Sequence, residues 1–189
     1  VAYEGAVFDG RYVYFVPSGT YQQYTGISHG EVMRYDTTSN FESAESWSTF
    51  IPSLYDIGEK TEGYIGAIFD GRYIYFAPHH NGNEYHGEVL RYDTTSNFES
   101  AESWSTFDVS NYSSDDPDGY IEGTFDGRYL YFSPINNNSF YHGEVLRYDT
   151  TFNFESAESW STFDAGANGV GNDPDGYSGA VFDGRYVYF

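Results

Sequence analysis

Residues 63–78, GYIGAIFDGRYIYFAP, have the alternation expected of two β-strands joined by a tight turn. The Asp-Gly pair at the centre is a strong hairpin signal, because both residue types tolerate positive φ. In the second half, the two tyrosines face one way while Ile74 and Phe76 face the other, so both faces are apolar or aromatic. We therefore predict a hairpin whose second strand is covered on both sides.

Two further segments have strand-like patterns. GEVLRYD at 87–93 predicts a third strand, and SWSTFD at 103–108 predicts a short fourth one. Between them, Ser96 precedes Glu99 by the three residues of a capping box, which indicates a single helical turn. The predicted unit therefore has four antiparallel strands.

This unit recurs about every 57 residues, as the tryptophans Trp47, Trp104 and Trp160 show. The hairpin occurs four times, and the strands that follow it occur three times. We predict one all-β array of four-stranded antiparallel blades of the β-propeller type, with three full units and a terminal hairpin. The approximate units are 1–62, 63–119, 120–176 and the partial 177–189. A β-solenoid usually has shorter repeats, and the strands of a β-sandwich would not recur so closely.

The units resemble two known families of blades. GAVFDGRYVYFVP, GEVMRYDTT and SWSTF resemble the blades of hemopexin-like domains, and RYDTT followed by Trp is similar to kelch blades. The resemblance covers each unit and implies a propeller fold. The Gly-Gly pair of kelch blades and the closing disulfide of hemopexin-like domains are absent, and an array of near-identical bacterial-type blades fits equally well.

The net charge of the chain limits the classes of partner that it can bind. Eight Lys and Arg against 29 Asp and Glu give a net charge of −21, which excludes binding to a nucleic-acid backbone or an anionic membrane surface. The seven arginines occupy repeated positions, so we expect them to pair with nearby aspartates. The acidic surface suits cation binding, a salty medium or the solubility of a protein in which 21% of residues are aromatic.

The remaining composition bears on compartment and processing. Cysteine is absent, so disulfides and thiolate sites are excluded, and no apolar run is long enough to span a bilayer. Abundant Tyr, Asn and Gly with a single lysine favours an extracellular or cell-surface location. Val1 in place of an initiator methionine indicates a processed or excised segment.

The variable loops indicate where binding would occur. In a four-stranded blade, the loops after the second strand and the loops between units emerge on one face, and almost all variation between units falls there. We call this the loop face. Its Tyr, Asn and His side chains suit neutral polar ligands such as sugars, although such residues also simply form turns. The predicted contact residues are Tyr21, Tyr24, His79, Asn81, Asn83, Tyr85, Asn136, Asn137, Asn138 and Tyr141.

Two motifs raise the question of metals. DDPDGY and NDPDGY place hard oxygen ligands around a turn, as calcium sites do, but Pro-Asp-Gly is also a good turn in itself. The candidate calcium ligands are Asp115, Asp116, Asp118, Asp173 and Asp175. The equivalent His29, His86 and His142 could form a ring of metal ligands, but they precede the third strand, away from the axis. We therefore expect each to make a structural hydrogen bond to a neighbouring Glu or Tyr. The axial strand carries small Gly-Ala pairs, which indicates a narrow channel for water or an ion.

Three functions remain open. We expect a non-enzymatic, lectin-like recognition module. The alternative is a structural or adhesive repeat protein whose units assemble with copies of themselves, the terminal hairpin either completing a blade with another chain or marking a longer array. A propeller-type glycosidase is third, because most acids recur in every unit whereas a substrate meets one unsymmetrical site.

Overall fold

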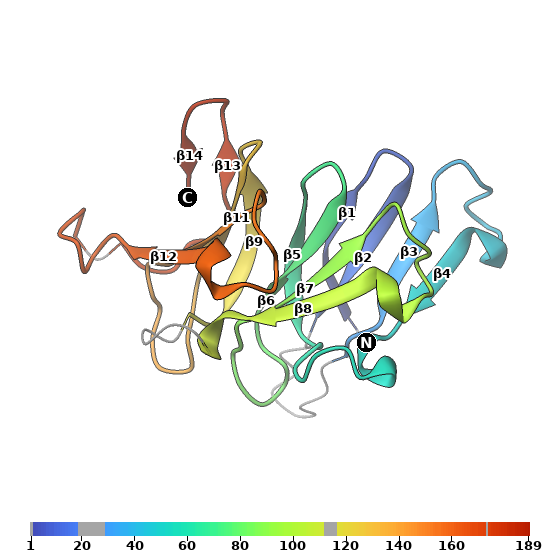
Figure 1. Cartoon of the computed structure of the whole chain (residues 1–189), viewed down its shortest axis with the longest axis horizontal. Coiled ribbons are helices and arrows are strands. Elements are labelled where there is room, and N and C mark those ends of the chain that lie inside the picture. The colour runs from blue at the N-terminus through green and yellow to red at the C-terminus, as the bar shows by residue number, and fades with distance from the viewer. Residues whose placement is uncertain (1, 19–28, 112–116, 173) are drawn as a thin grey trace.

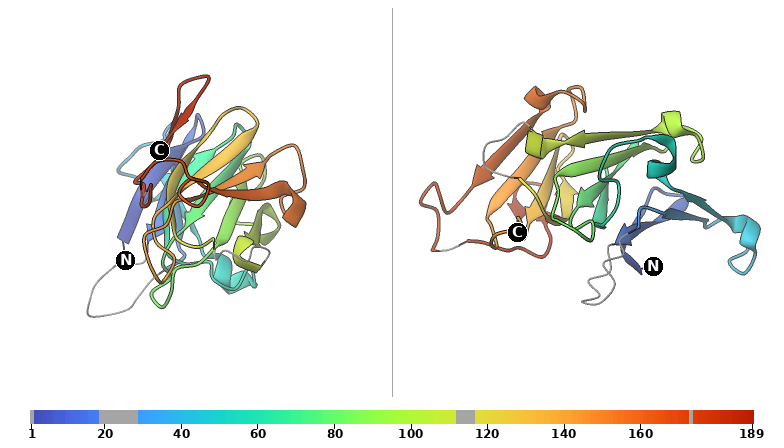
Figure 2. Two further views of the ribbon diagram at one scale, coloured as in Figure 1. Left: turned by 90° about the vertical axis from the view of Figure 1, so that its left-hand side faces the viewer. Right: turned by 90° about the horizontal axis from the view of Figure 1, so that it is seen from below.

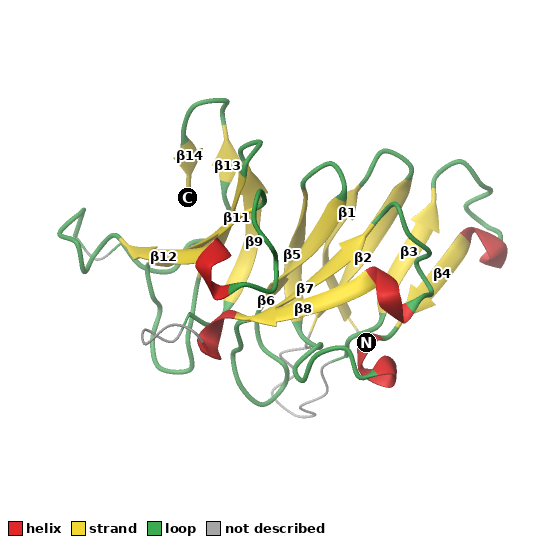
Figure 3. Cartoon of the chain, in the orientation of Figure 1, coloured by secondary structure: helices red, strands yellow, loops and turns green. Residues whose placement is uncertain are grey.

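The structure is a computed structural model that describes residues 2–18, 29–111, 117–172 and 174–189. It contains three four-stranded antiparallel sheets and a terminal two-stranded hairpin, side by side in chain order (Figures 1 and 3). Helical structure in these residues is limited to 3-10 turns of three or four residues. The chain is therefore an all-β array of propeller-type blades, as predicted.

Each sheet runs in simple meander order from the inner to the outer strand. Blade 1 consists of β1 (Ala2–Phe8), β2 (Tyr12–Ser18), β3 (Val32–Asp36) and β4 (Trp47–Phe50). Blade 2 consists of β5 (Tyr64–Phe69), β6 (Tyr73–Pro78), β7 (Glu88–Asp93) and β8 (Trp104–Asp108). Blade 3 consists of β9 (Tyr120–Phe125), β10 (Tyr129–Pro134), β11 (Glu144–Asp149) and β12 (Trp160–Asp164). The hairpin consists of β13 (Val181–Phe182) and β14 (Val187–Tyr188).

The Asp-Gly turns form as the sequence predicts, and the aspartate fixes each one. In blade 2, Asp70 Oδ1 accepts the amide protons of Arg72 and Tyr73 at 2.8 and 2.6 Å, while Oδ2 accepts the hydroxyl of Tyr75 at 2.9 Å. The same contacts recur at the other three turns. Each turn is therefore tied to the second strand of its own hairpin.

The arginines follow the predicted pairing only in part. Arg72 at the hairpin turn reaches Asp93 on the third strand at 2.7 Å, and its counterparts in blades 1 and 3 do the same. Among the residues that the structure describes, the arginine of the third strand pairs with no aspartate. Arg91 donates to Ser105 Oγ at 3.1 Å and lies 4.6 Å from the ring of Tyr73. Its neighbours on the sheet face are aromatic, so a cation–π contact takes the place of an ion pair.

The helical turn begins later than the capping box indicates. It spans Ala101–Ser103, and its N-cap Ser100 makes no side-chain capping bond. The carbonyl of Ser96 instead accepts the Tyr92 hydroxyl at 3.0 Å, while Asn97 Oδ1 accepts the Glu99 amide at 3.2 Å. Local side-chain contacts to the backbone thus shape the segment in place of a helix cap.

The core lies between blades. One cluster of buried side chains joins blades 1 and 2, and a second joins blades 2 and 3. Strand β6 contributes to both clusters, because Ile74 and Phe76 face blade 1 while Tyr75 faces blade 3. This confirms that the second strand of the unit is covered on both sides.

The first strands of successive blades lie next to one another at the inner edge of the array (Figure 2). A β-bulge interrupts each of them at the same place. Gly5 and Gly66 occupy the bulge in blades 1 and 2 with φ of 92° and 74°, and a Cβ on Gly5 would lie 3.0 Å from the Gly66 Cα. Blade 3 carries Glu122 there at φ 53°, a conformation that non-glycine residues rarely adopt.

Among the described residues, a search for helices that could span a membrane finds none of sufficient length and hydrophobicity.

Candidate functional site

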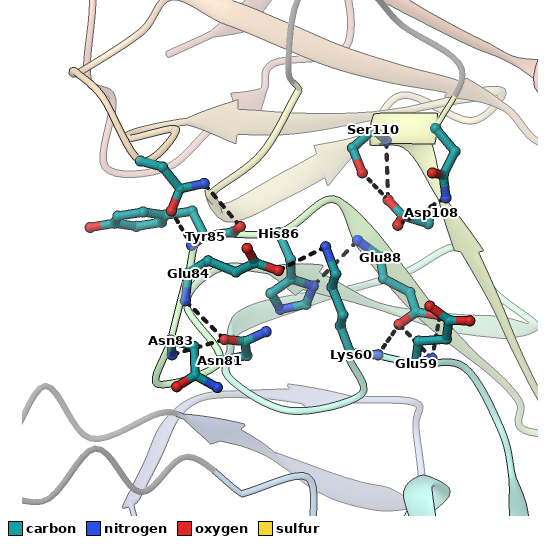
Figure 4. Close-up of polar contacts among 12 residues, drawn as sticks. Glu59, Lys60, Asn81, Asn83, Glu84, Tyr85, His86, Glu88, Asp108 and Ser110 are labelled. Carbon is teal, nitrogen blue, oxygen red and sulfur yellow. Dashed lines mark hydrogen bonds and ion pairs between the residues drawn. The ribbon is translucent and has the colours of Figure 1, made fainter.

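A polar pocket opens on the loop face between blades 1 and 2. It forms where the loop 51–63, which enters blade 2, runs beside the loop that follows β6. The pocket has a volume of about 230 Å³. Its lining residues are Ser53, Glu59, Lys60, Thr61, Glu62, Asn81 and Asn83. Most of the groups that shape it appear in Figure 4.

Glu88 holds the first of these loops in place. Its carboxylate accepts the backbone amides of Glu59 and Lys60, the former at 3.0 Å (Figure 4). The loop can wrap this closely because Gly58 has φ 70°, and a Cβ there would collide with the carboxylate. Burial raises the pKa of Glu88, although the two backbone amides favour its charged form. Glu88 therefore positions the pocket and is engaged by the backbone.

His86 supports the same loop from the start of β7. Its Nε2 bonds to the carbonyl of Glu62 at 3.0 Å, and its Nδ1 accepts the Glu88 amide at 3.3 Å. This pattern requires a neutral ring protonated on Nε2. Burial lowers the pKa of His86 to about 4. The ring also packs edge-on against Tyr64, with centroids 5.6 Å apart.

The histidine position has this role in blade 3 as well. His142 Nε2 bonds to the carbonyl of Asp118 at 2.9 Å and packs edge-on against Tyr120. In addition, the carbonyls of His86 and His142 accept the amides of Gly119 and Gly176, the glycines that directly precede the following units. His86 and His142 thus make structural hydrogen bonds, but the partner is a backbone carbonyl and not the Glu or Tyr side chain that we expected.

Lys60 brings the only amine side chain of the sequence into the pocket. Its Nζ lies 3.0 Å from Glu84 Oε1, and the lysine side chain keeps 30% of its surface exposed. Burial alone would lower the pKa of Lys60, but the bond to Glu84 and surrounding carboxylates outweigh it and raise the pKa. The pocket therefore presents a positively charged donor inside an acidic rim.

Two of the predicted contact residues line this pocket. Asn81 Oδ1 accepts the amides of Asn83 and Glu84, both at 3.0 Å, so it shapes the turn. Asn83 is exposed beside it. Of this pair, the side chain of Asn83 is the one turned outward at the rim.

Other predicted residues connect the loops of neighbouring blades. Asn138 Oδ1 accepts the Tyr85 amide at 2.7 Å, and its Nδ2 donates to the Tyr85 carbonyl at 3.2 Å. The Tyr85 ring lies edge-on to His79 and His80, with centroids 5.0 and 4.8 Å away. The contacts between Asn138 and Tyr85 therefore link the loops of blades 2 and 3.

The remaining predicted contacts lie in the loop of blade 3 or outside the described residues. Asn136 and Tyr141 form an isolated β-bridge, and Asn137 Oδ1 accepts the Phe140 amide at 3.3 Å. Tyr141 is 65% exposed. Tyr21 and Tyr24 lie outside the described residues. The structure thus brings the described predicted residues onto one face but in separate loops.

The calcium candidates are only partly described. Asp118 is 5% exposed, and both it and Asp175 lie beside the glycines that precede the third strands of blades 2 and 3. Asp115, Asp116 and Asp173 lie outside the described residues. Within the described part of the chain, no three His, Cys, Asp or Glu residues are grouped to hold a metal ion.

Sequence reasoning missed Lys60, Glu59 and Glu88 as parts of the site. The signal for Lys60 was present, since it is the single lysine of a strongly acidic chain. Glu88 has an equivalent in each of the three full units, so its position does not single it out. Its contact with a loop 28 residues earlier depends on the fold. Lys60, Asn83 and Glu59 line the pocket with side chains that can donate or accept hydrogen bonds. No protein-family model and no curated protein sequence matches the chain.

Proposed function

We propose that the chain is a non-enzymatic recognition module that binds neutral, hydroxyl-rich ligands such as polysaccharides at the pocket of the loop face. The observation that carries this proposal is the pocket itself, which is lined by polar side chains from two loops and contains the single lysine. Sugars are recognised by such convergent donors and acceptors on a rigid support. A module of this kind would act outside the cell or at its surface.

The charges around the pocket favour a neutral ligand over an anionic one. Glu59, Glu62 and Lys60 line it, and Glu84 already pairs with the amine. A polyanion would meet the field of a chain with net charge −21. Neutral polysaccharides avoid this repulsion and still use the carboxylates as hydrogen-bond acceptors.

A catalytic role has weaker support. A carboxyl group with a raised pKa is one mark of a general acid, and Glu88 has that property. However, its oxygens accept the amides that hold the loop, and it is only 5% exposed. Its role in loop anchoring accounts for its burial without a reaction.

A binding screen against immobilised polysaccharides, followed by calorimetric titration of the polysaccharide that binds most strongly, would test the proposal. Replacing Asn83 by Ala or Glu59 by Gln should weaken binding about tenfold, since hydrogen bonds to charged groups are worth about 1.5–3 kcal/mol and neutral ones about 1 kcal/mol. Glu42→Gln is a matched control, because it removes the same charge from an exposed glutamate on the opposite face. Absence of binding to every polysaccharide, or equal losses in Glu59→Gln and Glu42→Gln, would reject the proposal.

A further inference from the structure

Every blade has two different faces, and the array buries one of each at each junction. We call the face toward the following blade the trailing face and the face toward the preceding blade the leading face. Blade 1 uses its trailing face and blade 2 its leading face in the first core, and the same holds for blades 2 and 3 in the second. The trailing residues of blade 1 are Tyr14, Val16, Val32 and Phe50. The leading residues of blade 2 are Tyr64, Ile74, Phe76, Leu90, Tyr92, Phe98 and Trp104.

An aromatic stack repeats at both junctions. Phe50 stacks on Trp104 of the following blade, with centroids 4.8 Å apart and planes 6° apart. One unit later, Phe107 stacks on Trp160 at 5.4 Å and 5°. The trailing phenylalanine and the leading tryptophan therefore form a recurring contact of the array.

A cation–π contact repeats in the same way. Arg34 lies 4.3 Å from the ring of Phe98 in the following blade, and Arg91 lies 4.1 Å from Phe154. The rings of Phe98 and Phe154 are each 1% exposed. Each junction thus contains a cation–π contact between an arginine of one blade and a buried phenylalanine of the next.

The leading face of blade 1 and the trailing face of blade 3 lie at the two ends of the array, and we call them the end faces. They carry the equivalent residues without a neighbouring blade to contact them. Phe163 on the trailing face of blade 3 is 54% exposed, whereas its equivalents Phe50 and Phe107 are 4% and 5% exposed. Phe41 on the leading face of blade 1 is 64% exposed. Among the described contacts, Arg147 lies over Tyr129 of its own blade at 4.6 Å, and Trp47 contacts rings of its own blade.

An apolar groove marks the trailing face of blade 3. It has a volume of about 350 Å³. Its lining residues are Tyr131, Val145, Arg147, Ser161, Thr162 and Phe163, with Phe189 of the terminal hairpin at one side. Tyr131, Val145 and Phe163 are the counterparts of side chains buried at the two inner junctions.

The terminal hairpin occupies part of this face with a sequence found elsewhere in the chain. Residues 179–189 are identical to residues 5–15, which form the hairpin of blade 1. Strand β13 contacts β9 as β9 contacts β5. A blade 1 that took this place would therefore present the same eleven residues and add its third and fourth strands.

From this continuity with the inner junctions, we propose that a second copy of the chain docks its blade 1 on the blade 3 face of the first, displacing the terminal hairpin. Phe163 of one copy then stacks on Trp47 of the other, and Arg147 lies over Phe41. Two such contacts related by a twofold axis close a ring of six blades, within the four to eight that propellers use. The contact is head-to-tail, so copies that do not close a ring extend into a filament. The loop-face pocket is not part of this contact, and the proposal does not depend on it.

Analytical ultracentrifugation over a concentration series tests the contact. The wild type should form a species of at least twice the 21.4 kDa chain mass. Phe163→Asp and Phe41→Asp should each raise the dissociation constant at least ~tenfold, because each removes a central aromatic of the interface. Both side chains are more than half exposed, so the variants should keep the fold of the isolated chain.

Two comparisons make the result decisive. Phe152→Ser removes a 60% exposed phenylalanine that belongs to neither end face, and it restores the residue of the other units, so association should be unchanged. A mixture of Phe163→Asp and Phe41→Asp copies should associate better than either alone, since it contains one intact pair of faces. A wild type that stays monomeric at every concentration overturns the proposal. So does a loss in Phe163→Asp without a loss in Phe41→Asp, which a face-to-face contact would give.

Discussion

Phe41 and Phe98 offer an internal comparison of the forces that hold the blades together. They occupy the same position of consecutive units and have the same sequence around them, but Phe98 is 1% exposed and Phe41 is 64% exposed. Phe98 lies against Trp104 of its own blade and Tyr14 of the preceding one, with centroids 5.4 and 6.0 Å away. Among the described residues, the ring contacts of Phe41 are with Tyr35 and Trp47 of its own blade.

Replacing each by alanine should therefore have unequal effects. Removing a buried phenylalanine costs about 3–5 kcal/mol through lost burial and the cavity that remains. For Phe41, about one third of a full burial energy of about 1.5–3 kcal/mol is at stake, which gives about 0.5–1 kcal/mol. The expected difference between the two variants is about 2–4 kcal/mol, with Phe98→Ala the less stable.

Urea unfolding at low micromolar protein, followed by tryptophan fluorescence and circular dichroism, measures this difference. Low concentration keeps the second copy from covering Phe41. Coincidence of the two signals tests whether the array unfolds as one unit. Equal destabilisation by the two variants would show that the junction between blades contributes little to stability, and would refute the conclusion that the core lies between blades.

Further predictions concern strain, protonation and charge. Glu122→Gly should raise stability by about 1 kcal/mol in thermal unfolding, because it relieves a positive φ in a position that is glycine in the other units; an unchanged or lower melting temperature would argue against strain at this bulge. Burial lowers the pKa of His86 to about 4, so its contribution to stability is present above about pH 6.5 and is lost as the pH falls toward 4, by about 1.4 kcal/mol per pH unit. In His86→Gln, the free energy of unfolding should therefore fall less steeply over this pH range. An identical dependence on pH in the variant and the wild type would contradict this. Association of copies should strengthen as NaCl rises from 0.05 to about 0.5 M, because salt screens the repulsion between chains of charge −21; weaker association in high salt would indicate a contact dominated by ion pairs.

The sequence was sufficient for the repeat and its strands, because these depend on local signals. The Asp-Gly turn is specified by its own two residues and the aspartate side chain that caps it. The alternation in 73–78 specifies that both faces are covered, which β6 bears out. Neither inference requires knowledge of contacts distant in the chain.

Contacts between segments were less predictable. The arginine of the third strand stacks on aromatic rings because the next blade brings a phenylalanine beside it, a neighbour that no local pattern reveals. The loop 51–63 takes its shape from Glu88, which comes later in the chain. Asn138 was predicted as a ligand contact, but the structure places its amide on the backbone of Tyr85, more than 50 residues away. Loop residues that suit a ligand also suit one another, and only the fold shows which contact forms.

Hydrogen–deuterium exchange, with and without the polysaccharide that binds most tightly in the screen, tests the proposed recognition site most directly. We predict slower exchange in peptides covering 51–63 and 78–85, where the two loops form the pocket, and unchanged exchange in 94–103 on the opposite face. Protection confined to 94–103, or no protection at ligand concentrations that saturate the protein, would contradict the assignment of the binding site to the loop face.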